Sequence, residues 1–378
     1  MLYMVLNLFL EVIFGIMDRQ KKSSYSGGYS TSIHYLSFMS LLYHCDDLLY
    51  NAEDTFLSDL APHEITWDQH RSSAEDIAVL YNKDIEFEKL ADRINGCSGY
   101  LKFGVNPEGG ALVLKEVWFC RVRHCPVCQW RRSLRMRALM YKNIESVMNS
   151  YPSHRWIFLT LTVKNPHVTD LRSTLKEMNA GWQRLRQTKR FESVVDGFLK
   201  ATELTRPRYK GQEMHAHPHF HVMLLVKSTY FKGTSYIKQS EWTEMWIKAM
   251  RLDYYPQVDV RAVKPNKKKT AEQNQAALHD AILETFKYSV KPSDMLLYDD
   301  QGAWLHEVTR QTHRMRFYSD GGVLKGILKN EDEISNEEMI STTEEVVETD
   351  ETRFGFSYLP SQRRYVYNPK FNVYPETA

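Results

Sequence analysis

The sequence predicts an α+β fold with an open sheet, and three features support this prediction. Segments rich in β-branched residues, with apolar and polar residues alternating, recur through the middle of the chain. Segments with apolar residues at helical spacing lie between them. The chain of 378 residues can bury a sizeable core, and its five cysteines are too few for a disulfide scaffold. Strands interleaved with helices in this way are typical of an α+β domain.

The individual elements follow from these periodicities. Strands are expected at residues 155–163, 197–205, 219–227 and 257–264. Helices are expected at residues 168–190, 239–251 and 271–291. In the first of these helices apolar residues recur every three or four positions, at Leu171, Leu175, Met178, Trp182 and Leu185.

The formal net charge of +2 hides an uneven distribution of charge along the chain. Residues 331–353 contain ten acidic residues and one basic residue. The rest of the chain carries 48 lysines and arginines against 37 aspartates and glutamates. A basic body of this kind is compatible with a polyanionic partner, although charge alone does not identify nucleic acid.

The apolar stretch at residues 1–16 fits no targeting signal well. It is shorter than the ~20 residues that a membrane-spanning helix needs, and Glu11 interrupts it. No basic segment precedes it and no small-residue cleavage site follows it. Membrane insertion is one interpretation, and an over-extended reading frame with its true start at Met17 is another. We expect a cytoplasmic protein without stable membrane association.

The strongest local signal is the sequence HPHFH at residues 217–221. Side chains alternate between the two faces of a strand, so His219 and His221 are predicted to point the same way and Phe220 the opposite way. Two neutral imidazoles in this arrangement form a pair of metal ligands. Glu203, in the preceding strand, is the candidate third ligand. The alternative interpretation is an ordinary polar strand end.

A second group of candidate residues lies in the helix expected at residues 271–291. On a helix, Glu284, Tyr288 and Lys291 would share one face. Tyrosine is a poor nucleophile at neutral pH because its pKa is ~10. A nearby ammonium favours the phenolate, a metal ion polarises a phosphate under attack, and the carboxylate can serve as a base for later attack by water. An ordinary exposed helix face is the alternative.

A third group consists of Cys120, Cys125 and Cys128, with Cys97 upstream. Four thiolates suit a closed tetrahedral Zn²⁺ site, and the Cys-x2-Cys pair has the usual chelating spacing. His124 could replace one thiolate, although neighbours in sequence rarely both coordinate one ion. Buried cysteines without a metal are the alternative interpretation.

Arginines cluster around these cysteines, with Trp130 among them. Basic side chains interleaved with an aromatic residue are typical of a DNA contact surface. The candidate DNA-binding residues are Arg121, Arg123, Arg131, Arg132 and Arg135.

Taken together, these motifs resemble those of the rolling-circle plasmid replication initiators in the HUH endonuclease superfamily. The superfamily is named for two histidines that flank a bulky hydrophobic residue. The similar stretches occur in the family's order, at residues 120–136, 157–165, 217–226, 284–291 and 314–325. They span roughly two-thirds of the chain.

The resemblance implies an RRM-like antiparallel sheet of about five strands with helices packed on it. It implies that His219 and His221, with Glu203 as a less certain partner, hold Mg²⁺ or Mn²⁺. Tyr288 would nick one strand at a hairpin origin in plasmid DNA, leaving a 5′-phosphotyrosine and a free 3′-hydroxyl. Glu284 would activate water to end a round of replication. The expected partners are origin DNA and, in the host, a helicase and a DNA polymerase.

The resemblance, together with the composition of the segments that it does not cover, divides the chain into five parts. These are an N-terminal extension of uncertain structure (1–89), a cysteine-rich zinc-binding basic region (90–150), the HUH endonuclease domain (151–328), an acidic disordered linker (329–353) and an aromatic C-terminal segment (354–378).

Other functions share some of these motifs. A single-tyrosine transposase of the same superfamily would carry the same histidines and tyrosine, whereas relaxases usually place the tyrosine ahead of the histidines. A cupin-type metal oxygenase would need a glutamate shortly after the second histidine, where this chain has Leu224 and Leu225. A non-catalytic zinc-containing DNA-binding regulator is the remaining alternative, which only an activity assay separates.

Overall fold

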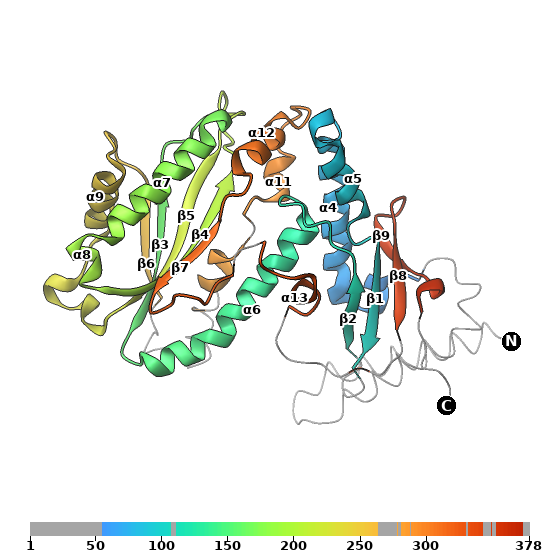
Figure 1. Ribbon diagram of the computed structural model, residues 1–378, viewed down its shortest axis with the longest axis horizontal. Helices are drawn as coiled ribbons and strands as arrows, with labels where there is room; N and C mark the ends of the chain where they lie inside the picture. The colour runs from blue at the N-terminus through green and yellow to red at the C-terminus, as the bar shows by residue number, and fades with distance from the viewer. Residues whose placement is uncertain are drawn as a thin grey trace, which may run out of the picture.

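The computed structural model describes residues 55–106, 111–263, 278, 281–287, 289–329, 332–342, 349 and 353–372. Within these ranges the chain forms two lobes, each built around an antiparallel sheet (Figure 1). The sheets hold five and four strands. Helix α6 (Pro126–Ser150) runs from the four-stranded lobe along the five-stranded lobe and links the two. The predicted α+β class, with a sheet of about five strands, is confirmed.

The larger sheet has the strand order β6-β3-β5-β4-β7, and every neighbouring pair is antiparallel. Its strands are β3 (Arg155–Thr162), β4 (Val195–Thr205), β5 (His217–Val226), β6 (Val258–Val263) and β7 (Tyr318–Gly322). The first four coincide with the strands predicted from alternation. The edge strand β7 was not predicted, because its sequence YSDGG contains residues that are depleted in strands.

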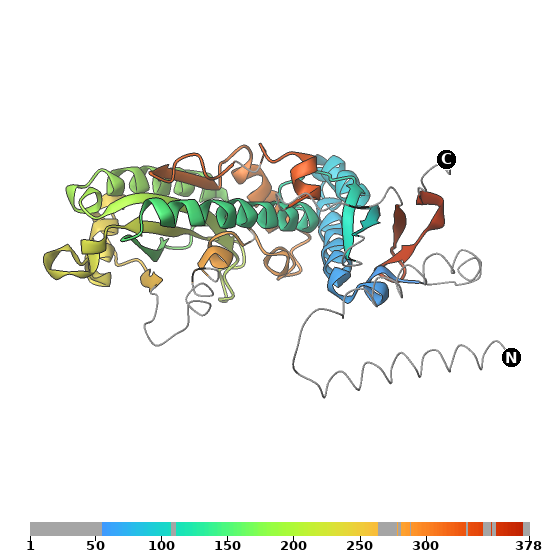
Figure 2. The ribbon, with the colours of Figure 1, turned by 90° about the horizontal axis from the view of Figure 1, so that it is seen from below.

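Helices cover one face of the larger sheet (Figures 1 and 2). They are α7 (Leu171–Arg186), α8 (Lys189–Glu192) and α9 (Gln239–Met250). Phe220 of β5 is fully buried on this face, with its ring 6.4 Å from that of Trp246 in α9. Because neighbouring residues of a strand point to opposite faces, His219 and His221 lie on the face away from these helices.

The helix predicted at residues 271–291 is wrong at its C-terminal end. Residues 281–285 are helical, but Val290 forms a parallel bridge with Leu204 of β4. The next helix, α11 (Pro292–Met295), begins with proline, and the residue before a proline is disfavoured in a helix. The pairing with the sheet and this proline together end the helix early. Much of its N-terminal half lies outside the described residues.

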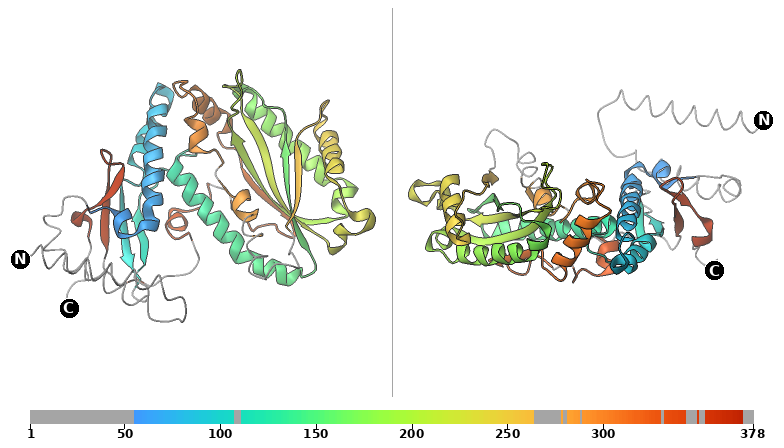
Figure 3. Two further views of the ribbon diagram at one scale, coloured as in Figure 1. Left: turned by 180° about the vertical axis from the view of Figure 1, so that it is seen from behind. Right: turned by 90° about the horizontal axis from the view of Figure 1, so that it is seen from above.

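The smaller sheet has the order β2-β1-β8-β9 and joins segments that are far apart in the sequence. Its strands are β1 (Tyr100–Val105), β2 (Leu112–Val117), β8 (Phe354–Leu359) and β9 (Arg364–Tyr367). The helices beside it are α3 (Leu57–Leu60), α4 (Ile65–Tyr81) and α5 (Glu88–Gly96). The buried Tyr365 donates a hydrogen bond through its hydroxyl to the Ser98 carbonyl at 2.6 Å. The C-terminal aromatic residues therefore belong to the core of this lobe. Their strands β8 and β9 lie beside β1 in the smaller sheet (Figure 3).

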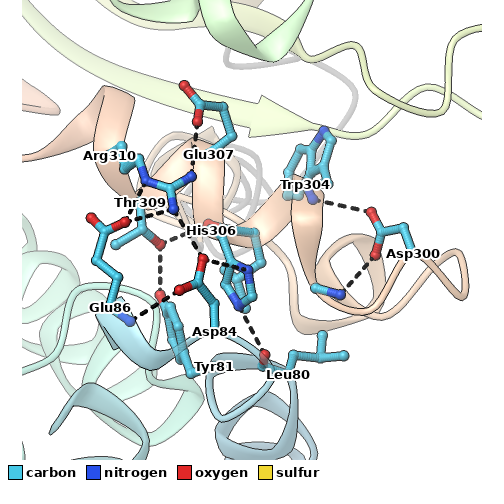
Figure 4. A network of polar contacts seen from close by, with 12 residues as sticks. Leu80, Tyr81, Asp84, Glu86, Asp300, Trp304, His306, Glu307, Thr309 and Arg310 are labelled. Atoms are coloured by element: carbon cyan, nitrogen blue, oxygen red, sulfur yellow. Dashed lines mark hydrogen bonds and ion pairs between the residues drawn. The ribbon is translucent and has the colours of Figure 1, made fainter. Parts of the chain in front are cut away.

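A polar network connects α12 (Ala303–Thr312) with the loop after α4 (Figure 4). Nη2 of Arg310 lies 2.6 Å from Oε2 of Glu86. His306 donates a hydrogen bond from Nε2 to the Leu80 carbonyl at 2.8 Å. These contacts attach the helices of the smaller lobe to the part of the chain that lies between strands β6 and β7 of the larger sheet.

The prediction of a disordered acidic linker at residues 329–353 is wrong for part of that segment. Residues Asn336–Ile340 form helix α13. Ser335 and Glu338 form a capping box, in which each side chain accepts a hydrogen bond from the other residue's backbone amide. Such a box satisfies amides that the first helical turn leaves unpaired, so it stabilises even a short helix.

Short 3₁₀ helices complete the described chain, at Pro62–Glu64, Ile85–Phe87, Val168–Asp170, Ser228–Phe231, Gly233–Ser235 and Pro369–Phe371. None of the helices in the described ranges combines the length and the apolar character that crossing a bilayer requires.

Candidate functional site

Three ligand-type side chains meet where β4 and β5 run side by side. Glu203 lies directly opposite His219 in the antiparallel register, and His221 lies two residues further along the same face of β5. Oε2 of Glu203 is 2.7 Å from Nε2 of His219 and 2.7 Å from Nε2 of His221. The structure thus brings together the three residues that the sequence suggested as metal ligands.

The carboxylate of Glu203 is both charged and buried in this site. Glu203 is 2% exposed. Burial alone raises the pKa of Glu203, but hydrogen bonds with His219, His221 and Lys287 outweigh it and hold the pKa well below its ordinary value. Burial lowers the pKa of His221 and lowers the pKa of His217 to about 4. An ionised carboxylate beside an unprotonated imidazole is the state that metal binding requires.

The site opens into a cavity of about 250 Å³. Its walls come from β3, β5, β6 and the segment after residue 281, and are formed by Thr160, Thr162, His217, His219, His221, Gln257, Asp259, Arg261, Glu284 and Lys287. Most of these side chains are polar or charged, so the cavity suits a polar ligand better than an apolar one.

The donor set fits a divalent cation. The ligand atoms of Glu203, His219 and His221 all lie within 4.8 Å of one another. Oε1 of Glu203 is buried and has no hydrogen-bond partner among the described residues, which is costly for an ionised group without a cation. Imidazole nitrogens together with a carboxylate oxygen suit Mn²⁺, whereas Mg²⁺ prefers a set made of oxygens.

Glu284, Tyr288 and Lys291 were predicted to share one helix face. For Glu284 and Lys291, the two that the structure describes, this prediction is wrong, because the helix ends at residue 285 and Lys291 has an extended backbone. Both side chains nevertheless reach the site. Oε1 of Glu284 is 3.9 Å from Nε2 of His221, and Nζ of Lys291 is 3.9 Å from Oε1 of Glu203. Tyr288 lies outside the described residues.

Lys287 is a residue of this site that the sequence analysis missed. Its Nζ lies 2.8 Å from Oε2 of Glu203 and 2.6 Å from Oε1 of Glu284. The i,i+3 spacing from Glu284 was a signal for the second contact. The contact with Glu203 could not be inferred, because it depends on how the segment packs against β4.

The four cysteines predicted to hold zinc come together between α5 and α6. Sγ of Cys97 is 3.7 Å from those of Cys125 and Cys128, and Sγ of Cys120 is 3.6 Å from that of Cys128. All four are buried, and their sulfur atoms lie within 4.8 Å of one another, which fits a tetrahedral Zn²⁺ site. His124 is not part of this group: its Nε2 is 3.3 Å from Oγ1 of Thr312.

The structure does not place the arginines predicted to bind DNA on an open surface, because the protein itself uses their guanidinium groups. Arg131 and Arg135 are buried, and Arg121 is half-buried. Arg131 donates to the carbonyls of Met339 and Ile340 at 2.6 and 2.7 Å. The remaining contacts are Arg135 with the Glu338 carboxylate at 2.8 Å, Arg121 with the Ile334 carbonyl at 2.7 Å, Arg123 with the Met315 carbonyl at 2.6 Å and Arg132 with the Arg121 carbonyl at 3.1 Å.

The acidic segment explains this outcome. Three of the five arginines bind residues of the segment around α13, whose last carbonyls and carboxylates offer a negative partner. Basic and acidic segments that are far apart in the sequence therefore pack against each other, which a local charge pattern does not reveal.

Fold and site together define a two-lobe α+β protein with one mixed histidine–carboxylate centre and one cysteine centre. The replication protein family matches residues 111–366, and the chain belongs to this family. It is 40% identical to a "Protein rep" of Bacillus amyloliquefaciens over 253 residues, which are 64% of this chain and 73% of the relative. It is 36% identical to a "Protein rep" of Lactiplantibacillus plantarum over 279 residues, which are 72% of this chain and 83% of the relative.

A "Protein rep" from a Bacillus species is 42% identical over 216 residues, covering 56% of this chain and 69% of the relative. No solved structure matches the chain. The family match and these relatives confirm the resemblance to plasmid rolling-circle replication initiators.

Proposed function

We propose that this initiator is a metal-dependent, site-specific DNA nickase and strand transferase that acts at the double-strand origin of its plasmid. Tyr288 would cut one strand, leaving a 5′-phosphotyrosine and a free 3′-hydroxyl for a host polymerase to extend, with a host helicase separating the strands. The observation that carries the proposal is the convergence of Glu203, His219 and His221 on one point beside a polar cavity. Tyr288 directly follows Lys287, which lines that cavity.

The proposed cleavage exchanges one phosphodiester bond for another. The Tyr288 oxygen forms a bond to phosphorus, the bond from phosphorus to the 3′ oxygen breaks, and that oxygen takes up a proton. Glu203, His219 and His221 would hold Mg²⁺ or Mn²⁺, which neutralises charge on the phosphate oxygens and makes phosphorus more open to attack. Lys291, whose Nζ is 3.9 Å from Oε1 of Glu203, would favour the phenolate form of Tyr288.

The position of Glu284 supports a role for its carboxylate in the second chemical step. Its side chain is 49% exposed, lines the cavity and reaches to 3.9 Å from Nε2 of His221. A carboxylate in that position can take a proton from water as the water oxygen attacks the phosphodiester at the regenerated nick site, where the bond from phosphorus to the 3′ oxygen breaks and that oxygen takes up a proton. The free 3′-hydroxyl then attacks the phosphotyrosine, the bond from phosphorus to the Tyr288 oxygen breaks, and the phenol takes up the proton that the hydroxyl loses. This step would release the displaced circle at the end of a round.

We further propose that residues 151–328 form the endonuclease unit and that the cysteine-rich region at 90–150 holds a structural Zn²⁺. A closed set of four thiolates leaves no position for a substrate, so the role of such an ion is to stabilise the fold. In this chain the cysteines join the end of α5 to the start of α6, and α6 in turn contacts the segment beside the site.

The test is cleavage of supercoiled plasmid DNA carrying the origin, with Mg²⁺ or Mn²⁺. Wild-type protein should convert it to the nicked form. Tyr288→Phe and His219→Ala should each abolish nicking while origin binding, measured by gel shift, is retained. Residual nicking by Tyr288→Phe would contradict the assignment of the nucleophile, and metal-independent nicking by the wild type would contradict the role of the ion.

A further inference from the structure

We propose that Lys287 is a built-in counter-cation of the metal centre, which competes with the divalent ion for Glu203 and gives way when the ion binds. This inference rests on the proposed function, because it assumes that Glu203, His219 and His221 hold the ion. It assigns a role to a side chain that neither the cleavage step nor the release step uses.

The position of the Lys287 ammonium carries the proposal. Its Nζ lies 2.8 Å from Oε2 of Glu203, the same oxygen that both histidine Nε2 atoms approach at 2.7 Å. Oε1, the other oxygen of this carboxylate, has no hydrogen-bond partner among the described residues. The ammonium is therefore bound to the oxygen at the centre of the ligand set.

A divalent ion and the Lys287 ammonium would repel each other strongly if both bound Oε2 of Glu203. Two cations that share one carboxylate oxygen lie only a few ångström apart. At that range the repulsion near a protein is several times stronger than in bulk water, and a divalent ion doubles it. Because Glu203 is 2% exposed, solvent screens this repulsion less than it would on the surface.

Lys287 has a second partner that can keep it after displacement. Its Nζ is 2.6 Å from Oε1 of Glu284, whose side chain is 49% exposed, whereas the side chain of Lys287 is 21% exposed. When the ion binds, the ammonium can leave Glu203 and stay with Glu284 at the cavity wall. Ion binding would thus shift Lys287 from the ligand Glu203 to the proposed base Glu284.

Lys291 offers a matched control in the same cluster. Its Nζ is 3.9 Å from Oε1 of Glu203, beyond hydrogen-bond distance, and its side chain is 45% exposed. Both lysines add one positive charge near the same carboxylate, but only Lys287 contacts the oxygen that faces the imidazoles. If substitutions of Lys287 and Lys291 change the Mn²⁺ affinity by different amounts, the difference therefore reflects direct contact with Glu203 rather than a general effect of charge.

The experiment is calorimetric titration of the full-length protein with Mn²⁺ alone, without DNA, comparing wild type, Lys287→Met, Lys287→Gln, Lys291→Met and His219→Ala. Both Lys287 variants should bind Mn²⁺ at least about tenfold more tightly than the wild type, because the competing charge is gone. Lys291→Met should tighten binding by less than about threefold, since its ammonium is more distant and more screened. His219→Ala should lose the site. Circular dichroism checks that each variant is folded.

The outcomes separate this inference from the proposed function. One outcome is that the wild type binds Mn²⁺, His219→Ala does not, and folded Lys287→Met and Lys287→Gln bind it with unchanged or lower affinity. That outcome would overturn the role of Lys287 and leave the metal centre intact. Equal tightening in the Lys287 and Lys291 variants would also overturn it, in favour of a general charge effect. Absence of Mn²⁺ binding in wild type and in every Lys287 variant would overturn both proposals.

Discussion

The two candidate metal centres in the described part of the chain differ in how far their ligand atoms are shielded from solvent. The cysteine centre has four thiols, each at most 1% exposed, with sulfur atoms as close as 3.6 Å. The histidine centre has two imidazoles and one carboxylate and faces a cavity of about 250 Å³, and no described residue donates a hydrogen bond to one of the carboxylate oxygens.

Because of this difference, the two centres are suited to different roles. Four protein ligands complete the coordination of a tetrahedral ion, so the cysteine centre has nothing left to offer a substrate. Three ligands beside a polar cavity leave positions for phosphate oxygens or water. We therefore expect that changes at the first centre affect folding, and that changes at the second affect chemistry.

The largest expected effect is loss of folding when the cysteine centre is broken. Binding of structural zinc contributes on the order of 10 kcal/mol in small zinc modules, so Cys128→Ser should lower the melting temperature markedly. Limited proteolysis should then cut residues 97–130 faster than in the wild type, and zinc content should fall. A Cys128→Ser protein with a wild-type melting temperature and no zinc would remove the structural role of the centre.

A large effect on chemistry without an effect on folding is expected for Glu203→Gln, which keeps the shape of the side chain but removes its charge. Nicking in a single-turnover assay should fall at least about 100-fold. Asp196→Asn is the matched control on the same strand, because Oδ2 of Asp196 also contacts an imidazole, that of His154, at 2.7 Å. That variant should nick within about threefold of the wild type, the range of modest surface effects. Similar losses in both variants would mean that carboxylate–imidazole pairs on β4 matter only for folding.

A smaller effect on cleavage is expected for Glu284→Ala, since Glu284 acts after the first step in the proposed mechanism. Initial nicking should fall by less than about tenfold, whereas release of monomeric circles should fail and multimeric products should accumulate. Gel analysis of replication products separates these outcomes. Normal monomeric circles would remove the proposed role of this carboxylate in release.

The smallest expected effect is a shift in pH dependence. Burial lowers the pKa of His221, so its imidazole stays unprotonated as the pH falls through the ordinary value of about 6.5. Mn²⁺ affinity should therefore persist below pH 6.5. The unfolded chain takes up this proton first, so the free energy of unfolding should decrease as the pH falls below about 6.5. Titrations with Mn²⁺ and urea between pH 5 and 8 check both trends, and a loss of affinity centred at pH 6.5 or above would contradict the first.

The sequence predicts four strands of the larger sheet and most of the two ligand clusters because these features depend on local spacing. Alternation placed His219 and His221 on one face of β5, and the Cys-x2-Cys spacing marked the cysteine centre. The pairing of Glu203 with His219 depends on the register between β4 and β5. That register is a property of the whole sheet, so the sequence could offer Glu203 only as a candidate.

Two cases show where local patterns fail. The helix predicted through Lys291 ends at residue 285 because Val290 pairs with Leu204 on another element. The arginine cluster was interpreted as a DNA surface, but Arg131 and Arg135 bind α13, which lies far along the chain. In both cases a partner distant in sequence decides the conformation.

Mass spectrometry tests most directly whether the histidine centre and Tyr288 cleave DNA together. The protein is incubated with Mn²⁺ and a single-stranded origin hairpin labelled at its 3′ end. We expect a covalent adduct in which residue 288 carries the 5′ phosphate of the labelled fragment. The adduct should be absent in Tyr288→Phe and in His219→Ala. An adduct on another residue, or one that forms equally in Tyr288→Phe, would show that Tyr288 is not the nucleophile.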